Sequence, residues 1–131
     1  MKLVDSSAWV EYLRRNGNRN VKEIVESLLR TDQAAYTCPI RFELLCGVKP
    51  SEENDLEQAF AFSHHYPFEL KDWLEAALLQ RQLQGSGLNI PRIDLFVATV
   101  AIRTGLVVLC RDTHFSAAQN VLGARLKVEQ V

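Results

Sequence analysis

Two kinds of apolar run alternate along the chain. Short apolar runs bounded by polar residues or turn residues predict strands, and longer runs with apolar side chains three or four positions apart predict amphipathic helices. The strands are expected at residues 2–4, 34–38, 66–70, 106–110 and 126–128. The helices are expected at residues 8–15, 21–30, 39–48, 51–65, 72–84, 93–104 and 115–122.

The alternation of strands with helices favours a parallel sheet covered on both faces, because each crossover places a helix against the sheet. The segment 93–104 is apolar almost all round, which is typical of a buried helix. Gly105 is expected to end this helix, and Asp72 is expected to cap the helix 72–84. The predicted fold class is therefore α/β, a three-layer α/β/α sandwich around a parallel sheet.

The composition fits one globular domain spanning residues 1–131, with 47% hydrophobic and 24% charged residues. No segment resembles a signal peptide or reaches transmembrane length, so a cytoplasmic protein without a membrane partner is expected. Cys38, Cys46 and Cys110 lie inside apolar patterns without a C-x-x-C pair, which predicts reduced, buried thiols.

Four acidic residues occupy positions that an α/β fold gathers. Asp5 and Asp112 each follow an apolar strand pattern, whereas Glu43 and Asp94 each lie near a proline suited to begin a helix. The carboxyl ends of parallel strands and the starts of the following helices share one edge of the sheet, where such folds bind ligands. This placement predicts a divalent-metal site. Singly, Asp5 could instead be a helix cap and Asp94 a partner of the helix dipole.

The formal charge is −1, from 15 basic and 16 acidic residues. Setting aside the four clustered acids leaves 15 basic against 12 acidic residues, so the rest of the surface carries a net charge of +3. Bound cations would neutralise much of the cluster. A phosphate polymer is therefore compatible with the composition as a partner.

Four segments resemble a PIN domain of the VapC kind, the ribonuclease toxin of toxin–antitoxin modules. In order, they are Val4-Asp5-Ser6-Ser7-Ala8-Trp9, Arg41-Phe42-Glu43-Leu44-Leu45-Cys46-Gly47, the segment from Ile93-Asp94 to Val100-Ala101, and Leu109-Cys110-Arg111-Asp112-Thr113-His114-Phe115. Each segment alone is weak, but four in order at suitable spacing are specific, and the resemblance spans essentially the whole chain.

The resemblance implies that Asp5, Glu43, Asp94 and Asp112 are metal-binding and catalytic residues that hold Mg²⁺ or Mn²⁺ and cut single-stranded RNA. It also implies an antitoxin whose C-terminal segment crosses the toxin, and a homodimer. Oxygen ligands without histidine or cysteine suit Mg²⁺, and one or two such cations can activate water and stabilise the departing oxygen. The side chains that could line partner contacts are Trp9, Tyr12, Phe60 and Phe62, with core packing as the alternative.

Five other polar residues near the acids are candidates for substrate binding: Ser6, Arg41, Arg92, Arg111 and His114. The arginines could bind phosphate in a bidentate manner and the histidine could shuttle a proton, whereas a capping serine, solvated arginines and an ordinary loop histidine are the alternatives. His64 and His65 are adjacent, so on a helix they would diverge rather than chelate together. Cys110 departs from the family pattern, which commonly has threonine there.

Two other function classes are alternatives for this sequence. A phosphorylation-dependent receiver domain has similar length and layers, but its mechanism requires paired acids after the first strand, where Asp5 stands alone. A PIN fold that has lost catalysis and only binds a partner is the other alternative, and the presence of all four acids argues against it.

Overall fold

Five parallel strands form the sheet at the centre of the molecule. The computed structural model describes residues 1–131. The strands are β1 (Lys2–Val4), β2 (Ala34–Tyr36), β3 (His64–His65), β4 (Val107–Cys110) and β5 (Lys127–Gln130). Their spatial order is β3-β2-β1-β4-β5, and every neighbouring pair is parallel. Because β1 is central, Asp5 leaves the sheet between the carboxyl ends of β2 and β4.

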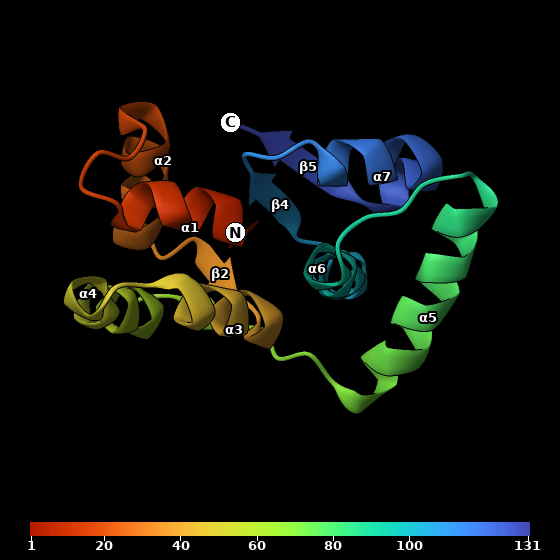
Figure 1. Cartoon of the computed structure of the whole chain (residues 1–131), viewed down its shortest axis with the longest axis horizontal. Helices are drawn as coiled ribbons and strands as arrows, with labels where there is room; N and C mark the ends of the chain where they lie inside the picture. Colours follow the sequence, from red (N-terminus) through yellow and green to blue (C-terminus); the bar gives the residue numbers. More distant parts are fainter.

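Seven α-helices surround this sheet. They are α1 (Ser6–Leu13), α2 (Arg19–Arg30), α3 (Cys38–Gly47), α4 (Pro50–Ala61), α5 (Leu70–Gly85), α6 (Arg92–Thr104) and α7 (His114–Leu122), and a short 3₁₀ helix, Gly123–Arg125, precedes β5. Both α1 and α6 contact β4, and they lie on opposite sides of it in Figure 1. The α/β fold class with a parallel sheet covered on both faces is confirmed.

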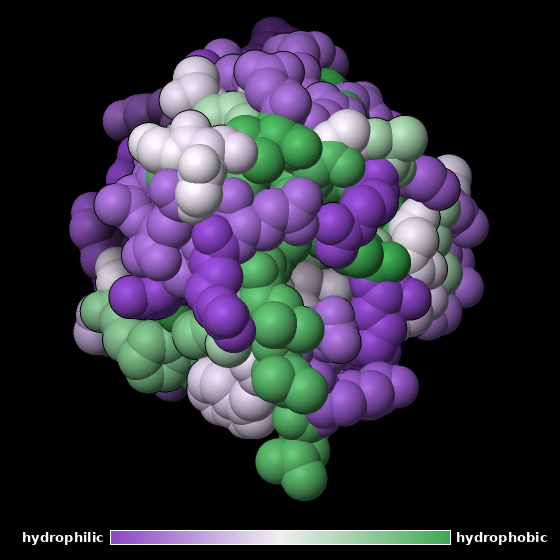
Figure 2. Space-filling model, turned by 90° about the vertical axis from the view of Figure 1, so that its right-hand side faces the viewer, coloured by the Kyte–Doolittle hydropathy of each residue, from purple (hydrophilic) through white to green (hydrophobic).

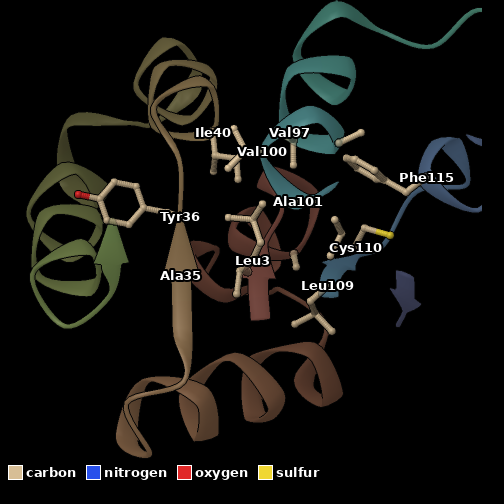
Figure 3. Close-up of a cluster of buried hydrophobic side chains, with 14 of the residues drawn as sticks. Leu3, Ala35, Tyr36, Ile40, Val97, Val100, Ala101, Leu109, Cys110 and Phe115 are labelled. Atoms are coloured by element: carbon tan, nitrogen blue, oxygen red, sulfur yellow. The ribbon is translucent and has the colours of Figure 1, made fainter. Parts of the chain in front are cut away.

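The core is centred on β1 and α6. Leu3 of β1 is fully buried, and its side chain lies on the face of the sheet that α6 covers with Val97, Val100 and Ala101 (Figure 3). Leu109 of β4 is also fully buried, but it points to the opposite face. Burying a leucine side chain of this kind contributes about 1.5 to 3 kcal/mol, so the core fixes how α6 sits on the sheet. This packing places the first turn of α6, with Asp94, beside the carboxyl ends of the central strands.

Sharp turns make the helix boundaries distinct. Gly105 ends α6 with a φ of 72°, a left-handed conformation that glycine adopts without strain, as the sequence predicts. Gly17 lies in the turn between α1 and α2, where a Cβ atom would be 1.8 Å from the carbonyl oxygen of Glu11. Only glycine, which has no Cβ atom, allows the backbone to pass this close to Glu11. Gly17 is therefore required by packing as well as by the helix break that the sequence predicts.

Three sequence predictions about the middle of the chain are wrong. The helix expected at 51–65 ends at Ala61, and His64 and His65 form β3. The segment 66–70 is therefore not a strand. Asp72 does not cap α5, because Glu69 is the N-cap and Asp72, one turn in, accepts a hydrogen bond from the backbone N–H of Glu69 at 2.8 Å. A two-residue strand has no alternation to detect, which explains why β3 was missed.

Several side chains lie elsewhere than the sequence predicts. Trp9 and Phe60 belong to the core, with ring centroids 5.4 Å apart, so they cannot line a partner contact. Phe62 is 71% exposed. The cysteines are all free, as expected, but Cys38 and Cys46 are exposed and only Cys110 is buried.

The surface carries one marked apolar feature. The side of the molecule that bears α5 faces the viewer in Figure 2, where apolar side chains form a band among polar ones. The large exposed apolar residues of this helix are Leu70, Trp73, Leu74 and Leu78. None of the helices has the length and apolar character needed to cross a membrane.

The strand order also decides one alternative. Receiver domains are doubly wound with the order 2-1-3-4-5, in which the first strand lies between the second and third. Here β1 lies between β2 and β4, with β3 at one edge. The receiver-like interpretation is therefore wrong.

Candidate functional site

A cleft of about 420 Å³ opens at the carboxyl edge of the sheet. Glu43 from α3, Asp94 from α6 and Asp112 from the loop after β4 all line it. The other polar lining residues are Ser6, Ser7, Arg14, Glu52 and His114. Three of the four acids singled out in the sequence thus share one cleft, although they are far apart along the chain.

The fourth acid, Asp5, is buried at the edge of this cleft. Its side chain caps α1, since Oδ2 accepts hydrogen bonds from the backbone N–H of Ser7 at 3.0 Å and from the Ser7 hydroxyl at 2.6 Å. The other oxygen, Oδ1, is buried without any hydrogen-bond partner. Burial, together with the negative charges of Asp112 and Glu43, raises the pKa of Asp5 to about 6, although the hydrogen bonds from Ser7 oppose the rise. The capping role proposed as an alternative is therefore real, but it accounts for only one of the two oxygens.

Asp94, Asp112 and His114 form a tight group. The Nδ1 atom of His114 is 2.7 Å from Oδ2 of Asp94 and 3.5 Å from Oδ1 of Asp112. Oδ1 of Asp112 also accepts the backbone N–H of His114 at 2.9 Å, which fixes this carboxylate at the start of α7. Burial, and then the charges of Asp5 and Asp112, raise the pKa of Asp94 to about 7, although His114 opposes the rise.

Two serines organise the remaining carboxylates. Ser6 donates its hydroxyl hydrogen to Oε2 of Glu43 at 2.5 Å, which ties α1 to α3 across the cleft. The Ser7 hydroxyl donates to Asp5 and accepts the backbone N–H of Arg111 at 2.9 Å, so it links the ends of β1 and β4. Ser7 received no role from the sequence, because its contacts join residues more than 100 positions apart.

The three arginines predicted for phosphate binding do not line the cleft. One guanidinium nitrogen of Arg41 donates to both carboxylate oxygens of Glu57, at 2.9 and 3.0 Å, and Arg111 lies 3.7 Å from Glu11. Arg92 is exposed. The arginine that does line the cleft is Arg14, directly after α1. Sequence analysis missed it because Arg14 lies nine positions from the nearest candidate acid.

Cys110 is fully buried next to the site. Its thiol lies 3.8 Å from the backbone carbonyl oxygen of Asp112. Burial and then the surrounding acids raise the pKa of this thiol to about 12, so it stays protonated near neutral pH. A neutral thiol is neither a nucleophile nor a metal ligand, which leaves the carboxylates as the reactive groups here.

The donor set suits a divalent cation. Oxygen ligands from carboxylates are those that Mg²⁺ and Mn²⁺ take in proteins, and Asp5 supplies a buried oxygen with no protein partner. Asp94, Asp112 and His114 each offer a ligand atom, all within 4.8 Å of one another. Burial is the main cause of the raised pKa values of Asp5 and Asp94, and repulsion between the neighbouring carboxylates adds to it. A cation bound among the carboxylates would relieve that repulsion.

Comparisons with known proteins agree with this fold. VapC ribonuclease Mb1587 of Mycobacterium bovis and Ribonuclease VapC11 of Mycobacterium tuberculosis are each 28% identical over 127 residues, covering 92% of this chain and 93% of each relative. The fold is similar to that of a chain in the solved structure of VapBC2 from Rickettsia felis bound to a promoter DNA fragment, with a TM-score of 0.82 and 17% identity over 99% of this chain and 98% of that one. It is also similar to a chain in the structure of DNA-bound VapBC from Salmonella typhimurium, with a TM-score of 0.78 and 14% identity over 99% of this chain and 98% of that one.

The family model for the PIN domain matches residues 2–121. This match includes all four acids and the strands β1 and β4, which Asp5 and Asp112 follow. The chain therefore belongs to the PIN domain family.

Proposed function

We propose that this chain is a metal-dependent endoribonuclease that cuts single-stranded RNA as the toxin of a toxin–antitoxin pair, acting as one domain over residues 1–131. The observation that carries the proposal is the buried, unpartnered Oδ1 of Asp5 beside a cleft lined by Glu43, Asp94 and Asp112. Membership of the PIN family and the similarity to proteins named as VapC ribonucleases support it.

In this proposal Asp5 and Asp94 hold Mg²⁺ or Mn²⁺ directly. Glu43, oriented by the Ser6 hydroxyl, and Asp112, fixed by the backbone N–H of His114, complete the site or orient the attacking water. Once bound, the cation lowers the pKa of water and offsets charge on the phosphate oxygens during hydrolysis. The protein holds the four carboxylates close together, and their mutual repulsion lowers the stability of the fold until a cation offsets their negative charge.

Basic residues beside the cleft are proposed to bind the phosphates of the RNA backbone. Arg14 lines both the acidic cleft and an adjoining hollow, which is also lined by Arg15 and Lys49. All three side chains are exposed. Contacts of this kind bind phosphate without reading sequence, so Arg14→Ala is expected to weaken RNA binding and to reduce its salt dependence by about one phosphate contact.

RNA cleavage in the presence and absence of metal tests the activity. The purified protein should cut single-stranded RNA in Mg²⁺ or Mn²⁺ and should stop in EDTA. Asp5→Asn should lower the rate by about 100-fold, the usual scale for removing one charge-stabilising group. The matched control is Asp32→Asn, which changes an exposed acid that is paired with His64 far from the cleft and should keep full activity.

Two outcomes would reject this assignment. Cleavage that persists equally in EDTA would exclude the metal mechanism. A wild-type protein that binds RNA but cuts none in either metal would favour the alternative of a PIN fold that only binds its partner.

A second groove supports the proposal of an antitoxin partner. It lies between α1, α2 and α4, with apolar lining from Tyr12, Leu13, Leu29, Ala59 and Phe62 and a charged rim of Lys22, Glu26, Arg30 and Asp55. An apolar floor with charges of both signs at its rim suits a segment that folds onto the surface as it binds. The antitoxin chain is proposed to cross this groove toward the acidic cleft.

Growth experiments test the toxin assignment and the groove together. Expression of the chain alone should arrest growth of its native host, and co-expression of the neighbouring small gene should relieve the arrest. Asp94→Asn should be harmless. Phe62→Asp should remain toxic but escape neutralisation, since it alters the groove and not the cleft. Abundant wild-type protein without any slowing of growth would refute the toxin role.

The exposed apolar face of α5 supports the proposal of a homodimer. Leu70, Trp73, Leu74 and Leu78 follow helical spacing and are 45 to 88% exposed, which is unusual for large apolar side chains on one helix. Light scattering should give twice the chain mass for the wild type and the monomer mass for Leu74→Asp. A wild type that is monomeric at all concentrations would contradict the proposal.

A further inference from the structure

His114 stands among the acids rather than in an ordinary loop. Its ring comes from the first residue of α7, whereas Asp94 comes from the first turn of α6 and Asp112 from the loop after β4. The side chain is 45% exposed and lines the cleft, so its nitrogen is accessible from solvent. The sequence suggested a contact with RNA or a proton shuttle for this residue, and neither role requires Nδ1 to face two carboxylates.

The spacing of the three ligand atoms fits shared coordination. Adjacent ligand atoms around an octahedral ion at about 2.1 Å are about 3 Å apart. The two measured separations of the His114 Nδ1 atom, 2.7 Å from Asp94 and 3.5 Å from Asp112, lie on either side of that value. All three ligand atoms lie within 4.8 Å of one another, so side-chain rotations would bring them around one ion.

A second feature points to a ligand at the same place. Oδ1 of Asp5, almost completely buried, has no hydrogen-bond partner in the protein, and the charge of this residue influences Asp94 directly. A buried carboxylate oxygen left unpaired costs free energy unless something binds it. The acidic cluster together with this oxygen and the imidazole is thus a site with mixed oxygen and nitrogen donors.

We propose that the imidazole Nδ1 of His114 is a direct metal ligand, which makes this site favour divalent transition metals over Mg²⁺. The inference rests on the proposed metal site and adds a residue and a selectivity to it. Imidazole nitrogen binds metals such as Ni²⁺, Fe²⁺ and Zn²⁺ strongly, whereas Mg²⁺ prefers oxygen ligands and retains its waters. A site of four carboxylates alone would show this preference less strongly.

Metal binding measured without any RNA tests the proposal. Pulsed electron paramagnetic resonance of bound Mn²⁺ should detect a ¹⁴N coupling from one imidazole in the wild type. His114→Ala should lose that coupling. By titration calorimetry the same change should weaken Ni²⁺ binding by about tenfold or more, the scale on which ligand and near-ligand changes act. Mg²⁺ affinity should change far less.

The matched control is His65→Gln, because the exposed Cys38 thiol lies 3.3 Å from Nε2 of His65 and this pair could also take up Ni²⁺. The control should retain both the ¹⁴N coupling and the Ni²⁺ affinity of the cleft. If Mn²⁺ binds to the wild type without a ¹⁴N coupling, the imidazole of His114 does not coordinate the ion and the proposal is overturned. Equal losses of Ni²⁺ and Mg²⁺ affinity in His114→Ala would also overturn it. A wild type that binds no divalent metal would instead refute the proposed metal site.

Discussion

At the scale of single residues, the site consists of side chains whose local interactions conflict. Asp94 lies in the first turn of α6, where a negative charge is favoured by the helix dipole, but burial and the neighbouring acids disfavour that same charge. The balance raises its pKa to about 7. Such a residue stabilises the fold less than a neutral one of the same shape would, which is the pattern expected where function opposes stability.

Replacing this acid tests the conflict. Asp94→Asn is expected to raise the melting temperature in EDTA, because the amide keeps the shape and removes a charge from a crowded site. The gain should grow as the pH rises from about 4 to 7, where the unfolded chain has released the Asp94 proton and the folded chain retains it, and should level off above pH 7. Mg²⁺ or Mn²⁺ should stabilise the wild type much more than the variant, since binding to the native state adds stability by mass action.

Melting curves of both proteins with and without metal decide this prediction. A variant that is less stable in EDTA and keeps the full metal-induced shift would mark Asp94 as a purely structural residue of α6. The proposed ligand set would then be wrong.

The sequence allowed the acids to be found but not their supporting residues. An acid directly after a strand or early in a helix is visible in one dimension, because parallel strands place such positions at one edge. The link between Ser7 and Arg111, the position of Arg14 in the cleft and the exposure of Cys38 depend on which segments become neighbours in space. No local pattern encodes those contacts.

At the scale of elements, α5 shows how a single buried pair can fix a helix. Asp72 is fully buried in the first turn of α5, and its two oxygens accept hydrogen bonds from Arg103 of α6 at 2.9 and 3.0 Å. The sequence predicted the helix from its leucine and alanine spacing but assigned Asp72 to the cap. The true N-cap is Glu69, three residues earlier. The partner in α6 could not be inferred, because it lies 31 residues away.

Breaking this pair should loosen α5 from α6. Asp72→Ala is expected to lower the free energy of unfolding by about 3 kcal/mol, because it leaves Arg103 without its buried partner and Glu69 without a capping acceptor. Lys71→Ala is the control, since the Lys71 side chain is 67% exposed and its pair with Glu69 is worth about 0.5 kcal/mol or less. Urea denaturation of both variants measures the two effects, and similar losses would show that the buried pair has no special role.

At the scale of the whole molecule, the alternation of strands and helices was sufficient to predict a parallel sheet but not its strand order. The order β3-β2-β1-β4-β5 depends on which strand each crossover reaches, and short strands of two to four residues carry no pairing information of their own. Because β1 is central in this order, Asp5 lies buried at the carboxyl edge of the sheet, between the ends of β2 and β4. Its unusual pKa is therefore a property of the topology rather than of the local sequence.

That topology makes the stability of the metal-free protein depend on pH. The pKa of Asp5 is about 6 in the folded protein against an ordinary value of 3.8, so between about pH 4 and pH 7 the folded chain retains a proton that the unfolded chain releases. Stability from this group is fully present below pH 4 and is lost as the pH rises through 6. The full loss has an upper bound of about 3 kcal/mol, from 1.36 kcal/mol for each pKa unit.

Asp5→Asn removes this dependence and keeps an acceptor for Ser7. We expect the unfolding free energy of the wild type, minus that of the variant, to fall as the pH is raised from 4 to 7 in EDTA. The pKa of His65 is lowered by burial and then by Arg41, so this residue makes the protein more stable as the pH rises. Its contribution is the same in both proteins and cancels in the difference. Saturating Mn²⁺ should reverse the slope of the wild type, because metal ligands must be deprotonated to bind. Denaturation curves at several pH values measure both slopes. If the difference in unfolding free energy stays constant with pH in EDTA, the Asp5 carboxyl does not retain a proton in the folded protein, and the prediction is wrong.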